Sequence, residues 1–416
     1  MTLSKSPTVL VVGGGAAGLM AAATAAKRGL DVTVLERNER MARKLMITGK
    51  GRCNITNNCG VQEFISNVPE NGRFLYSTVS AFTPARLINL LEEQGLPLKT
   101  ERGNRVFPQS DKARDVVDTL VSLARKSKCR FRKGRAKSLL IEGGFCRGAE
   151  LDNGEKILSD AVIICTGGMS YPLTGSTGDG YLLAEQAGHT IISPRPSLVP
   201  LVSSDKWCAD VQGLSLKNCS IKVQDIQNGK IIYKDFGEML FTHFGISGPM
   251  VLSASAHMRS IQPGRYKIMI DLKPALSPEQ LDARLVRDFT ENKNHDFSNS
   301  LGGLLPRSLI PVIVSLSEIQ PDTKCNNITK QQRRRLGALL KGFTVNISGF
   351  RPIEEAIVTS GGVKVSEINA KTMQSKLVKG LSFAGELIDV DAYTGGFNLH
   401  IAFSTGFAAG NHVIKD

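Results

Sequence analysis

Residues 8–37, which read TVLVVGGGAAGLMAAATAAKRGLDVTVLER, decide the fold. A β-branched run stops at Gly13, an alanine-rich helical pattern follows Gly15 and Gly18, and a second apolar run ends at Glu36. Gly13 makes the turn, Gly15 lets a pyrophosphate approach, and Gly18 lets helix and strand pack closely. The helix N-terminus attracts phosphates, and the acid suits an adenosine ribose. The stretch predicts a dinucleotide site; a glycine-rich turn in an unrelated α/β protein is the alternative, disfavoured by this spacing.

Length and charge bound the class of protein. At 416 residues the chain can form two or three domains, and its 41% hydrophobic content with 41 glycines is typical of a soluble α/β protein. A net charge of +14 favours anionic partners, such as a dinucleotide, an acidic substrate or RNA. Ordinary surface charge gives the same value, so the charge alone decides nothing.

Cysteines and apolar segments indicate the compartment. Eight cysteines are scattered without a CxxC pair or a Cys/His ligand spacing, so we expect reduced thiols in a cytoplasm and no metal site. Residues 7–26 carry no charge over about the length of a membrane span. Three consecutive glycines interrupt that stretch, so we expect neither a signal peptide nor a transmembrane helix.

Two stretches are strongly basic. Residues 36–57, ERNERMARKLMITGKGRCNITN, indicate an ordered loop with a short helix, whose cations would neutralise a nearby pyrophosphate. A solvated loop is the alternative. Residues 124–137, ARKSKCRFRKGRAK, fit the end of a helix and an exposed strand. The sharper alternative for this second stretch is a patch that faces RNA phosphates.

The chain between these stretches and residue 194 continues the α/β pattern. The spacing predicts amphipathic helices at 82–95 and 111–126 and a buried strand at 160–165 that ends in Thr166, Gly167 and Gly168. A turn then opens a helix with Asp179 near its N-cap. Three short strands at 138–141, 148–151 and 156–158 predict a β-meander between the second helix and the buried strand.

The last part of the chain repeats the pattern of strand, glycine-rich turn and helix seen at residues 8–37. Residues 380–410, GLSFAGELIDVDAYTGGFNLHIAFSTGFAAG, predict a strand at 381–384, Gly385 and Glu386 at its end, and a glycine pair that opens a helix near Asn398. Two dinucleotide-type signatures at opposite ends imply one discontinuous domain, with a cofactor across the carboxyl ends of its strands. We therefore expect an FAD-type domain of residues 1–194 and 352–416. Prolines near 194 mark an insert of residues 195–351, with a β-barrel part at 195–274 and a helical part at 275–345.

The later motifs resemble one family. GGGAAG with Glu36, RKLMITGKGRCNITN, CTGG, GSTGDGY, THFGISGP and GELIDVDAYTGGFN together resemble the BaiN/RdsA-type NAD(P)/FAD-dependent oxidoreductases, which lie near the aminoacetone oxidases. The resemblance runs essentially end to end. It implies tightly bound FAD in a two-dinucleotide-binding-type flavoprotein fold, α/β in class. A Rossmann-like domain closed by both termini would carry an inserted β-barrel and helical subdomain.

The resemblance also implies cofactor contacts. The first glycines and Glu36 would hold the ADP half, the 51–54 loop and CTGG would line the middle of FAD, and the C-terminal glycines would reach the ribityl chain and flavin ring. The full predicted set is Gly13, Gly15, Ala16, Ala17, Gly18, Glu36, Arg37, Lys44, Gly51, Arg52, Cys53, Asn54, Ala136, Thr166, Gly167, Gly168, Gly385, Glu386, Asp391, Gly395, Gly396, Phe397, Asn398 and Leu399.

The predicted chemistry is hydride transfer at the flavin. A helix that starts near Asn398 and points at flavin N1 and the C2 carbonyl would stabilise the negative charge of reduced flavin. Adding hydride to a C=C bond also requires a proton donor within reach, and the candidates are Cys53, His243, Tyr393 and His400. A satisfied, partly buried histidine is an equal reading of His243. Because no second complete GxGxxG unit appears, NAD(P)H would dock transiently, or another reductant would serve.

The sequence leaves the substrate open. Relatives in the resembled family are linked to unsaturated 3-oxo bile acids, to dihydrouridine formation in ribosomal RNA and to amine oxidation. We expect an NAD(P)H-driven reductase that acts on an enone or on uridine of ribosomal RNA, with no membrane partner and with no indication of oligomeric state. An aminoacetone-type amine oxidase that releases peroxide is one alternative. A non-catalytic flavin-binding sensor or scaffold is the other.

Overall fold

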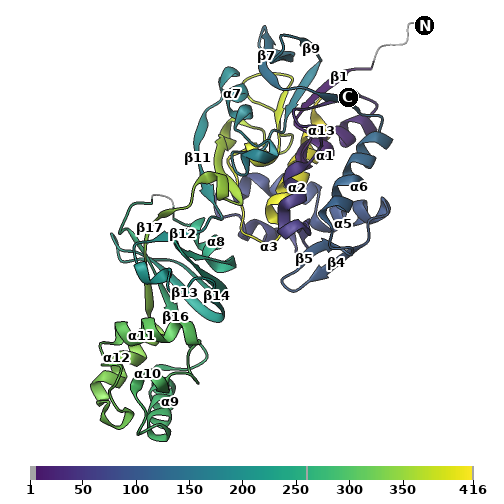
Figure 1. Cartoon of the computed structure of the whole chain (residues 1–416). Coiled ribbons are helices and arrows are strands. Elements are labelled where there is room, and N and C mark those ends of the chain that lie inside the picture. Colours follow the sequence, from purple (N-terminus) through teal and green to yellow (C-terminus); the bar gives the residue numbers. More distant parts are fainter. Residues whose placement is uncertain (1–5, 259–260, 415–416) are drawn as a thin grey trace, which may run out of the picture. The chain divides into compact units, whose positions relative to one another are not determined.

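The computed structural model describes residues 6–258 and 261–414, which form two compact units (Figure 1). Unit 1 comprises Met1–Ser197 and Pro352–Asp416, and unit 2 comprises Leu198–Arg351. The sequence analysis expected the boundaries after residues 194 and 351. No helix among the described residues is long and apolar enough to cross a membrane.

A five-stranded parallel sheet organises unit 1. The strand order is β19-β10-β1-β2-β6, and each neighbouring pair is parallel. Residues 9–12 and 161–164 in the two central strands are all buried, as expected when helices or loops cover both faces of a parallel sheet. The predicted Rossmann-like sheet, closed by both ends of the chain, is confirmed. Its strands are β1 (Thr8–Val12), β2 (Asp31–Glu36), β6 (Arg130–Lys133), β10 (Ala161–Ile164) and β19 (Leu381–Phe383).

Helices α1 (Ala16–Lys27) and α13 (Phe397–His412) join the two ends of the chain in unit 1. A Cβ at Gly406 would lie 2.4 Å from the carbonyl oxygen of Ala17, and one at Gly410 would lie 2.3 Å from that of Ala21. Only glycine permits so close an approach of one helix to the backbone of another. The seam brings residues almost 400 positions apart into one core (Figure 1).

The remaining elements of unit 1 largely follow the sequence prediction. The β-meander is confirmed as sheet β7-β8-β9, and Thr83 caps the predicted helix by accepting a hydrogen bond from the backbone N–H of Arg86 at 3.2 Å. The helices are α2 (Arg43–Ile47), α3 (Val61–Ser66), α4 (Tyr76–Ala81), α5 (Pro84–Glu93), α6 (Ala113–Lys126) and α7 (Asp179–Gln186). The strands are β3 (Thr56–Asn57), β4 (Leu98–Glu101), β5 (Arg105–Pro108), β7 (Ala136–Glu142), β8 (Phe145–Leu151), β9 (Lys156–Leu158), β11 (Ile191–Ser197) and β18 (Val358–Val363).

The basic run at 124–137 is the end of α6 followed by β6, the edge strand of the parallel sheet. Four of its cations have carboxylate partners, which favours the plainer of the two sequence interpretations. The pairs are Arg130 with Asp31, Arg132 with Glu155, Lys133 with Glu39, and Arg135 with Asp179.

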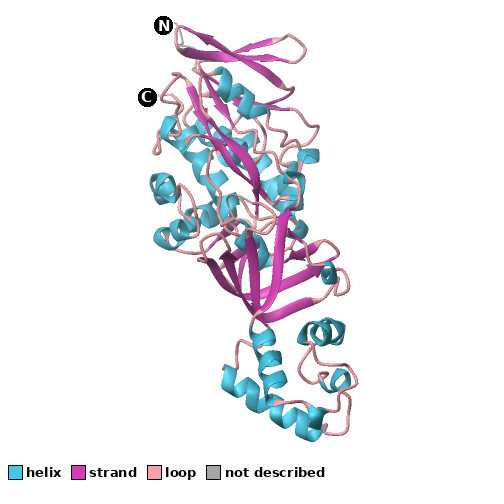
Figure 2. Ribbon diagram, turned by 90° about the vertical axis from the view of Figure 1, so that its left-hand side faces the viewer, coloured by secondary structure: helices cyan, strands magenta, loops and turns pink. Residues whose placement is uncertain are grey.

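Unit 2 is a closed antiparallel barrel with a helical extension (Figure 2). The sequence placed the barrel within 195–274, but its closing strand β17 comes after the helices and pairs with both β12 and β16. The barrel strands are β12 (Leu201–Ser203), β13 (Ser215–Asp225), β14 (Ile231–Thr242), β15 (Gly245–Ser247), β16 (Tyr266–Asp271) and β17 (Phe343–Phe350). The helices are α8 (Pro249–Ser255), α9 (Pro278–Glu291), α10 (Phe297–Ser300), α11 (Ile310–Ser317) and α12 (Lys330–Lys341).

Candidate cofactor site

The glycines of the turn between β1 and α1 are required for two reasons, close packing and open space. Gly13 has φ +106°, and a Cβ there would lie 2.5 Å from the carbonyl oxygen of Cys165. A Cβ at Gly18 would lie 1.8 Å from the carbonyl oxygen of Gly13. At Gly15, by contrast, a Cβ would meet no atom within 4 Å. The first and third glycines are therefore fixed by packing, while the middle one faces open space at the N-terminus of α1, which suits a phosphate.

Glu36 ends β2 beside this turn, and the residue is only 8% exposed. Its Oε2 accepts a hydrogen bond from the backbone N–H of Gly14 at 2.8 Å. Its Oε1 accepts hydrogen bonds from the backbone and side-chain nitrogens of Asn38, at 2.9 and 2.8 Å. These contacts hold the carboxylate at the turn, where a ribose hydroxyl would have to reach it.

A small cavity lies beside the turn and is lined by Val12, Glu36, Ala136, Thr166 and Leu183 among others. The hydroxyl of Thr166 is buried and has no hydrogen-bond partner among the described residues. That oxygen lies 2.0 Å from the position of a Cβ built on Gly180, so the first turn of α7 covers it. The cavity volume is about 40 Å³, so in this structure it is a narrow crevice beside Glu36.

Lys44 and Glu386 form a partly buried ion pair at the carboxyl ends of the strands. The Nζ atom of Lys44 lies 2.6 Å from Oε2 of Glu386 and 2.6 Å from Oγ of Ser170. The other carboxylate oxygen accepts from the backbone N–H of Thr359 at 2.9 Å and from the Ser170 hydroxyl at 3.0 Å. A Cβ at Gly168 would lie 2.5 Å from Oγ1 of Thr359, so the CTGG turn is pressed onto this network.

Sequence reasoning missed three residues of this edge: Ser170, Thr359 and Thr405. The hydroxyl of Thr405 accepts a hydrogen bond from the backbone N–H of Gly385 at 2.9 Å, which fixes the turn after β19. The glycine pair in VTSGG at 358–362 follows an apolar stretch and was the available signal for Thr359. Ser170 in GGMSYP and Thr405 in FSTG stand in no recognised motif, so the sequence gave no signal for these two.

The loop before α13 is also fixed. Gly396 has φ +99°, and a Cβ there would lie 2.4 Å from the backbone carbon and oxygen of Thr56. Asn398 donates to the carbonyl of Ala392 at 2.7 Å and accepts from its N–H at 2.9 Å. Buried Asp391 accepts from the hydroxyl of Ser197 at 2.6 Å, and burial raises its pKa.

The other predicted cofactor residues lie around the same edge of unit 1. Ala16 and Ala17 are the first residues of α1, Gly51 ends the short turn after α2, and Gly167 follows Thr166 after β10. Phe397 and Leu399 lie in the first turn of α13. Gly395 accepts from the side chain of Asn57 at 3.2 Å, and Asn54, with its amide turned to satisfy both neighbours, accepts from Gly396 at 3.1 Å.

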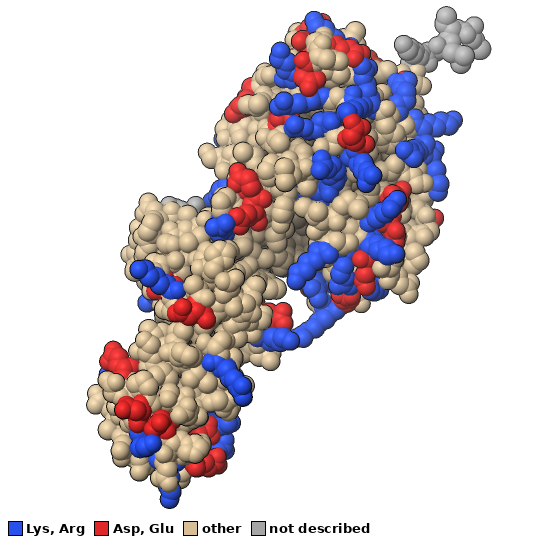
Figure 3. Space-filling view, in the orientation of Figure 1, with Lys and Arg blue, Asp and Glu red and all other residues tan. Residues whose placement is uncertain are grey.

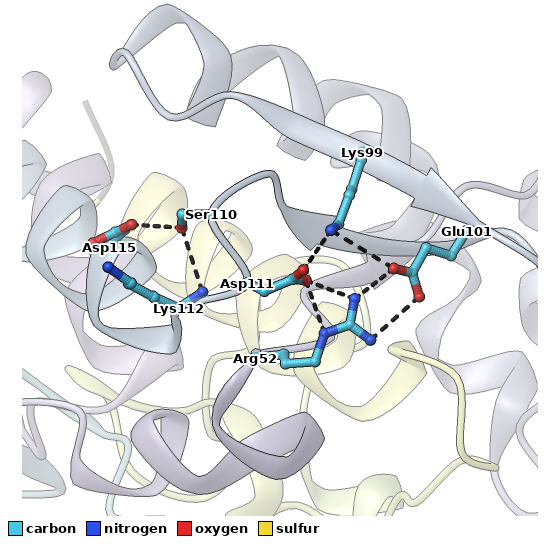
Figure 4. A network of polar contacts seen from close by, with 7 residues as sticks. All are labelled: Arg52, Lys99, Glu101, Ser110, Asp111, Lys112 and Asp115. Carbon is cyan, nitrogen blue, oxygen red and sulfur yellow. Dashed lines mark hydrogen bonds and ion pairs between the residues drawn. The ribbon is translucent and has the colours of Figure 1, made fainter.

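The side chain of Arg52, which the sequence analysis placed along the middle of FAD, belongs to a charged network (Figure 4). Its guanidinium binds Glu101 and Asp111 and lies 4.1 Å over the ring of Phe107. Lys99 completes the network, with Nζ 2.6 Å from Oδ2 of Asp111. Hydrogen bonding to Arg52 lowers the pKa of Glu101, and hydrogen bonding to Lys99 and Arg52 lowers the pKa of Asp111.

The side chain of Arg37 also has an acidic partner. Its guanidinium lies 2.9 Å from Oδ2 of Asp179 and donates to Thr177 at 2.6 Å. Asp179 is the first residue of α7 and also binds Arg135. Both arginines that the sequence assigned to the cofactor therefore have acidic partners within unit 1.

Two of the candidate proton donors are fully buried. Nε2 of His400 donates to the carbonyl oxygen of Phe82 at 2.9 Å, and Nδ1 accepts from the hydroxyl of Thr56 at 3.1 Å. Burial lowers the pKa of this ring to about 4, so it is neutral and structural near pH 7. Burial also raises the pKa of Cys53 to about 12, which makes its thiol a weak acid.

The other two candidates are more accessible. His243 belongs to unit 2, in the exposed turn between β14 and β15, with its ring 5.0 Å from that of Phe244. Tyr393 belongs to unit 1 and is partly exposed in the loop before α13, where its N–H donates to the carbonyl of Asn67 at 3.0 Å. Of the four, Tyr393 combines access with a place beside the C-terminal glycines.

Fold and site together define a Rossmann-type flavoprotein oxidoreductase. A family model described as the HI0933-like protein Rossmann domain matches residues 7–412, and the chain belongs to this family. It is 30% identical to the 3-dehydro-bile acid delta(4,6)-reductase of Clostridium scindens, over 96% of this chain and 97% of that protein. It is also 30% identical to the ribosomal RNA dihydrouridine synthase of Escherichia coli, over 97% of each. The resemblance predicted from the motifs is confirmed.

Solved structures support the fold. The 3-ketosteroid-delta4-(5alpha)-dehydrogenase of Rhodococcus jostii RHA1 superposes with a TM-score of 0.54 at 14% identity, covering 100% of this chain and 99% of that one. The 3-ketosteroid delta1-dehydrogenase of Sterolibacterium denitrificans gives a TM-score of 0.51 at 13% identity, covering 98% and 99%. At such low identity these likenesses concern the fold alone.

Proposed function

We propose that unit 1 binds FAD along the carboxyl edge of its parallel sheet. One observation carries this proposal: β1, β10 and β19 are neighbours, so the turns GGGAAG, CTGG and AGE meet at one edge. Gly15 at the N-terminus of α1 would receive the pyrophosphate, and Glu36 the ribose.

The reactive end would lie against the start of α13. The bound cofactor would supply hydride transfer between a nicotinamide reductant and the substrate. The free N–H groups at the start of α13 carry partial positive charge and would stabilise negative charge placed near Gly396 and Phe397. The clamp between Asn398 and Ala392 keeps this loop in place.

We propose NAD(P)H-driven addition of hydride and a proton to an activated C=C bond as the reaction. Tyr393 would donate the proton from its phenol, because it is the accessible candidate of unit 1 beside the C-terminal glycines. The two relatives support two substrate classes, an unsaturated 3-oxo steroid acid and uridine in ribosomal RNA. The net charge of +14 favours the second, although much of the basic run is ion-paired.

The test begins with the flavin spectrum of the purified chain. NADH or NADPH is then added without oxygen, and bleaching of the flavin is followed before an enone or a uridine-containing ribosomal RNA is supplied. We expect bleaching by one nicotinamide and recovery of colour with one acceptor class. A colourless protein refutes the FAD site, peroxide release with a primary amine under air identifies an amine oxidase, and flavin that no donor reduces identifies a sensor or scaffold.

Tyr393→Phe tests the proton donor. We expect bleaching by NAD(P)H to continue at its normal rate while acceptor reduction slows by about 100-fold, the lower end of general acid contributions. Tyr76→Phe is the matched control, since Tyr76 is 53% exposed on α4. Equal acceptor rates in the two variants would remove Tyr393 from the mechanism.

A further inference from the structure

A second concave surface of unit 1 lies beside the small cavity at the glycine turn. This groove runs between the loop before α2, helix α6 and strand β6, and its volume is about 660 Å³. That volume falls within the range of about 300–1,000 Å³ found for small-molecule clefts. Lysine and arginine side chains are frequent on the face of the molecule that carries α2 and α6 (Figure 3). The proposed reaction gives this groove no role.

The groove has an apolar floor. Methionine, valine and phenylalanine side chains contribute to it from three separate parts of the chain, and such a floor accepts a flat ring. Phe131 is partly buried on β6, and the guanidinium of Arg125 lies 5.8 Å over its ring. The apolar residues are Met41, Met46, Val117, Val121 and Phe131.

The acids of the groove already have partners. Both carboxylate oxygens of Glu36 are held by the glycine turn and Asn38. Glu39 binds Lys133, and Asp118 pairs with Arg114 one helical turn away at 3.5 Å. None of these acids is therefore available to neutralise the remaining cations.

Three guanidinium groups remain around the floor. Arg40, Arg43 and Arg125 line the groove, are exposed, and have no carboxylate partner among the described residues. Arg43 only donates to the side-chain oxygen of Asn38 at 3.0 Å. Guanidinium groups bind phosphate oxygens in pairs and stack on rings, so three of them over an apolar floor match a phosphate attached to a flat base.

We propose that this groove binds a nucleoside phosphate, with the base on the apolar floor and the phosphate at Arg40, Arg43 and Arg125. Two sources share this chemistry: the phosphate-bearing nucleoside half of NADPH, and a nucleotide of an RNA strand. The groove is distinct from the small cavity beside the glycine turn, since Glu36 is the one residue that lines both. The inference deepens the proposed function and rests on it for the choice of these two sources, while binding of a nucleotide in the groove can fail separately from the FAD site.

Calorimetric titration of the full chain with uridine 5′-monophosphate tests the site. Uridine is chosen because its base differs from the adenine of the cofactor. We expect saturable binding that weakens with added salt, and about tenfold weaker binding to the double variant Arg40→Gln/Arg125→Gln. Uridine without phosphate should bind the unmodified chain about as weakly as the nucleotide binds the double variant.

Arg307→Gln provides the matched control, since Arg307 is an exposed arginine of unit 2 outside the groove. Flavin content and the thermal unfolding midpoint are recorded for every variant, so failure of the FAD proposal and failure of groove binding are separate results. No binding of the nucleotide at millimolar concentration, or equal affinity for the double variant and the control, overturns the proposal.

Competition identifies the source of the ligand. NADP⁺ and a hexauridylate are each titrated against bound uridine 5′-monophosphate. Displacement by NADP⁺ alone assigns the groove to the dinucleotide, and displacement by the oligonucleotide alone assigns it to RNA. Either result supports the site. If neither ligand displaces uridine 5′-monophosphate, the proposal is overturned.

Discussion

The carboxyl edge of the parallel sheet and the Arg52 network hold polar groups in opposite ways. At the edge, glycines are pressed against backbone atoms, and Glu386 is held by Thr359, Ser170 and Lys44. The Arg52 network consists of partly exposed charged side chains, from β4, from the loop after β5 and from the turn after α2 (Figure 4). The first region therefore depends on shape and desolvation, while the second depends on charge that solvent and salt screen.

The largest expected effect comes from the glycine turn. In Gly18→Ala the new Cβ would meet the carbonyl oxygen of Gly13 at 1.8 Å, so we expect a loss of about 3–5 kcal/mol in the free energy of unfolding. Gly15→Ala meets no atom within 4 Å and should change stability by under about 1 kcal/mol. Urea unfolding measures both variants.

The same pair separates folding from cofactor binding. Because the methyl group of Gly15→Ala would occupy the space meant for phosphate, we expect FAD affinity to fall by about tenfold or more in a folded protein. Fluorescence titration with FAD gives this value. Unchanged FAD affinity in Gly15→Ala would mean that the turn does not face the pyrophosphate.

The next effect concerns His400 and pH. The unfolded chain binds a proton at this ring near its ordinary pKa of about 6.5, whereas the folded chain does so only near pH 4. The unfolded state thus holds more protons in this window, so stability falls as pH drops from about 6.5 to about 4 and this contribution is fully lost below it. The contribution is about 3 kcal/mol.

His400→Gln should flatten that part of the pH profile, as measured by urea unfolding at several pH values. His295→Gln is the control, since His295 is exposed in unit 2. Equal slopes in the variant and in the unmodified chain would contradict the assignment of His400 as a neutral buried ring.

A smaller effect is expected at the Lys44–Glu386 pair. Glu386→Gln leaves the partly buried ammonium of Lys44 without its carboxylate at 2.6 Å, which should lower the free energy of unfolding by about 2 kcal/mol. Glu155→Gln breaks the exposed pair with Arg132 and should cost far less. If both variants lose the same stability, the contrast between the two regions fails.

The smallest effect is expected in the Arg52 network. Asp111→Asn removes a carboxylate that binds both Arg52 and Lys99, and the exposed position predicts a small drop in the thermal midpoint. The drop should vanish in concentrated salt or below the lowered pKa of Asp111, because its stabilisation exists only while the carboxyl is charged. Differential scanning calorimetry at two salt concentrations checks this. A large, salt-independent loss would place the network with the buried edge.

Sequence patterns predicted the fold class because each pattern had a local cause. The glycine spacing after β1, the apolar run of β10 and the glycines before α13 each determine a turn at a strand end, and parallel pairing brings these turns together. The closing strand β17 was missed because its pairing with β12 and β16 links residues that the helical part separates along the chain.

The candidate site was only partly predictable. Gly13, Gly18 and Gly396 follow from backbone geometry, which the sequence encodes directly. The direction of a long charged side chain does not, because it depends on partners brought by distant elements. Arg52 was expected at the cofactor, yet its guanidinium binds acids of β4 and of the loop after β5. Thr359 and Ser170 were missed because their place in the site depends on hydrogen bonds to Glu386, which is distant from both in the sequence.

The late position of β19 in the sequence, beside α13, has a consequence for synthesis on the ribosome. When Ser197 has been translated, β10 is still an open edge of the sheet, because β19 is encoded after the whole of unit 2. An unpaired apolar strand invites mispairing with other chains. Unit 2 is contiguous in the sequence, so it is expected to fold during this delay and to bring the two halves of the domain together. Nascent chains halted before Leu381 should therefore be cut by protease within residues 1–197 while unit 2 resists.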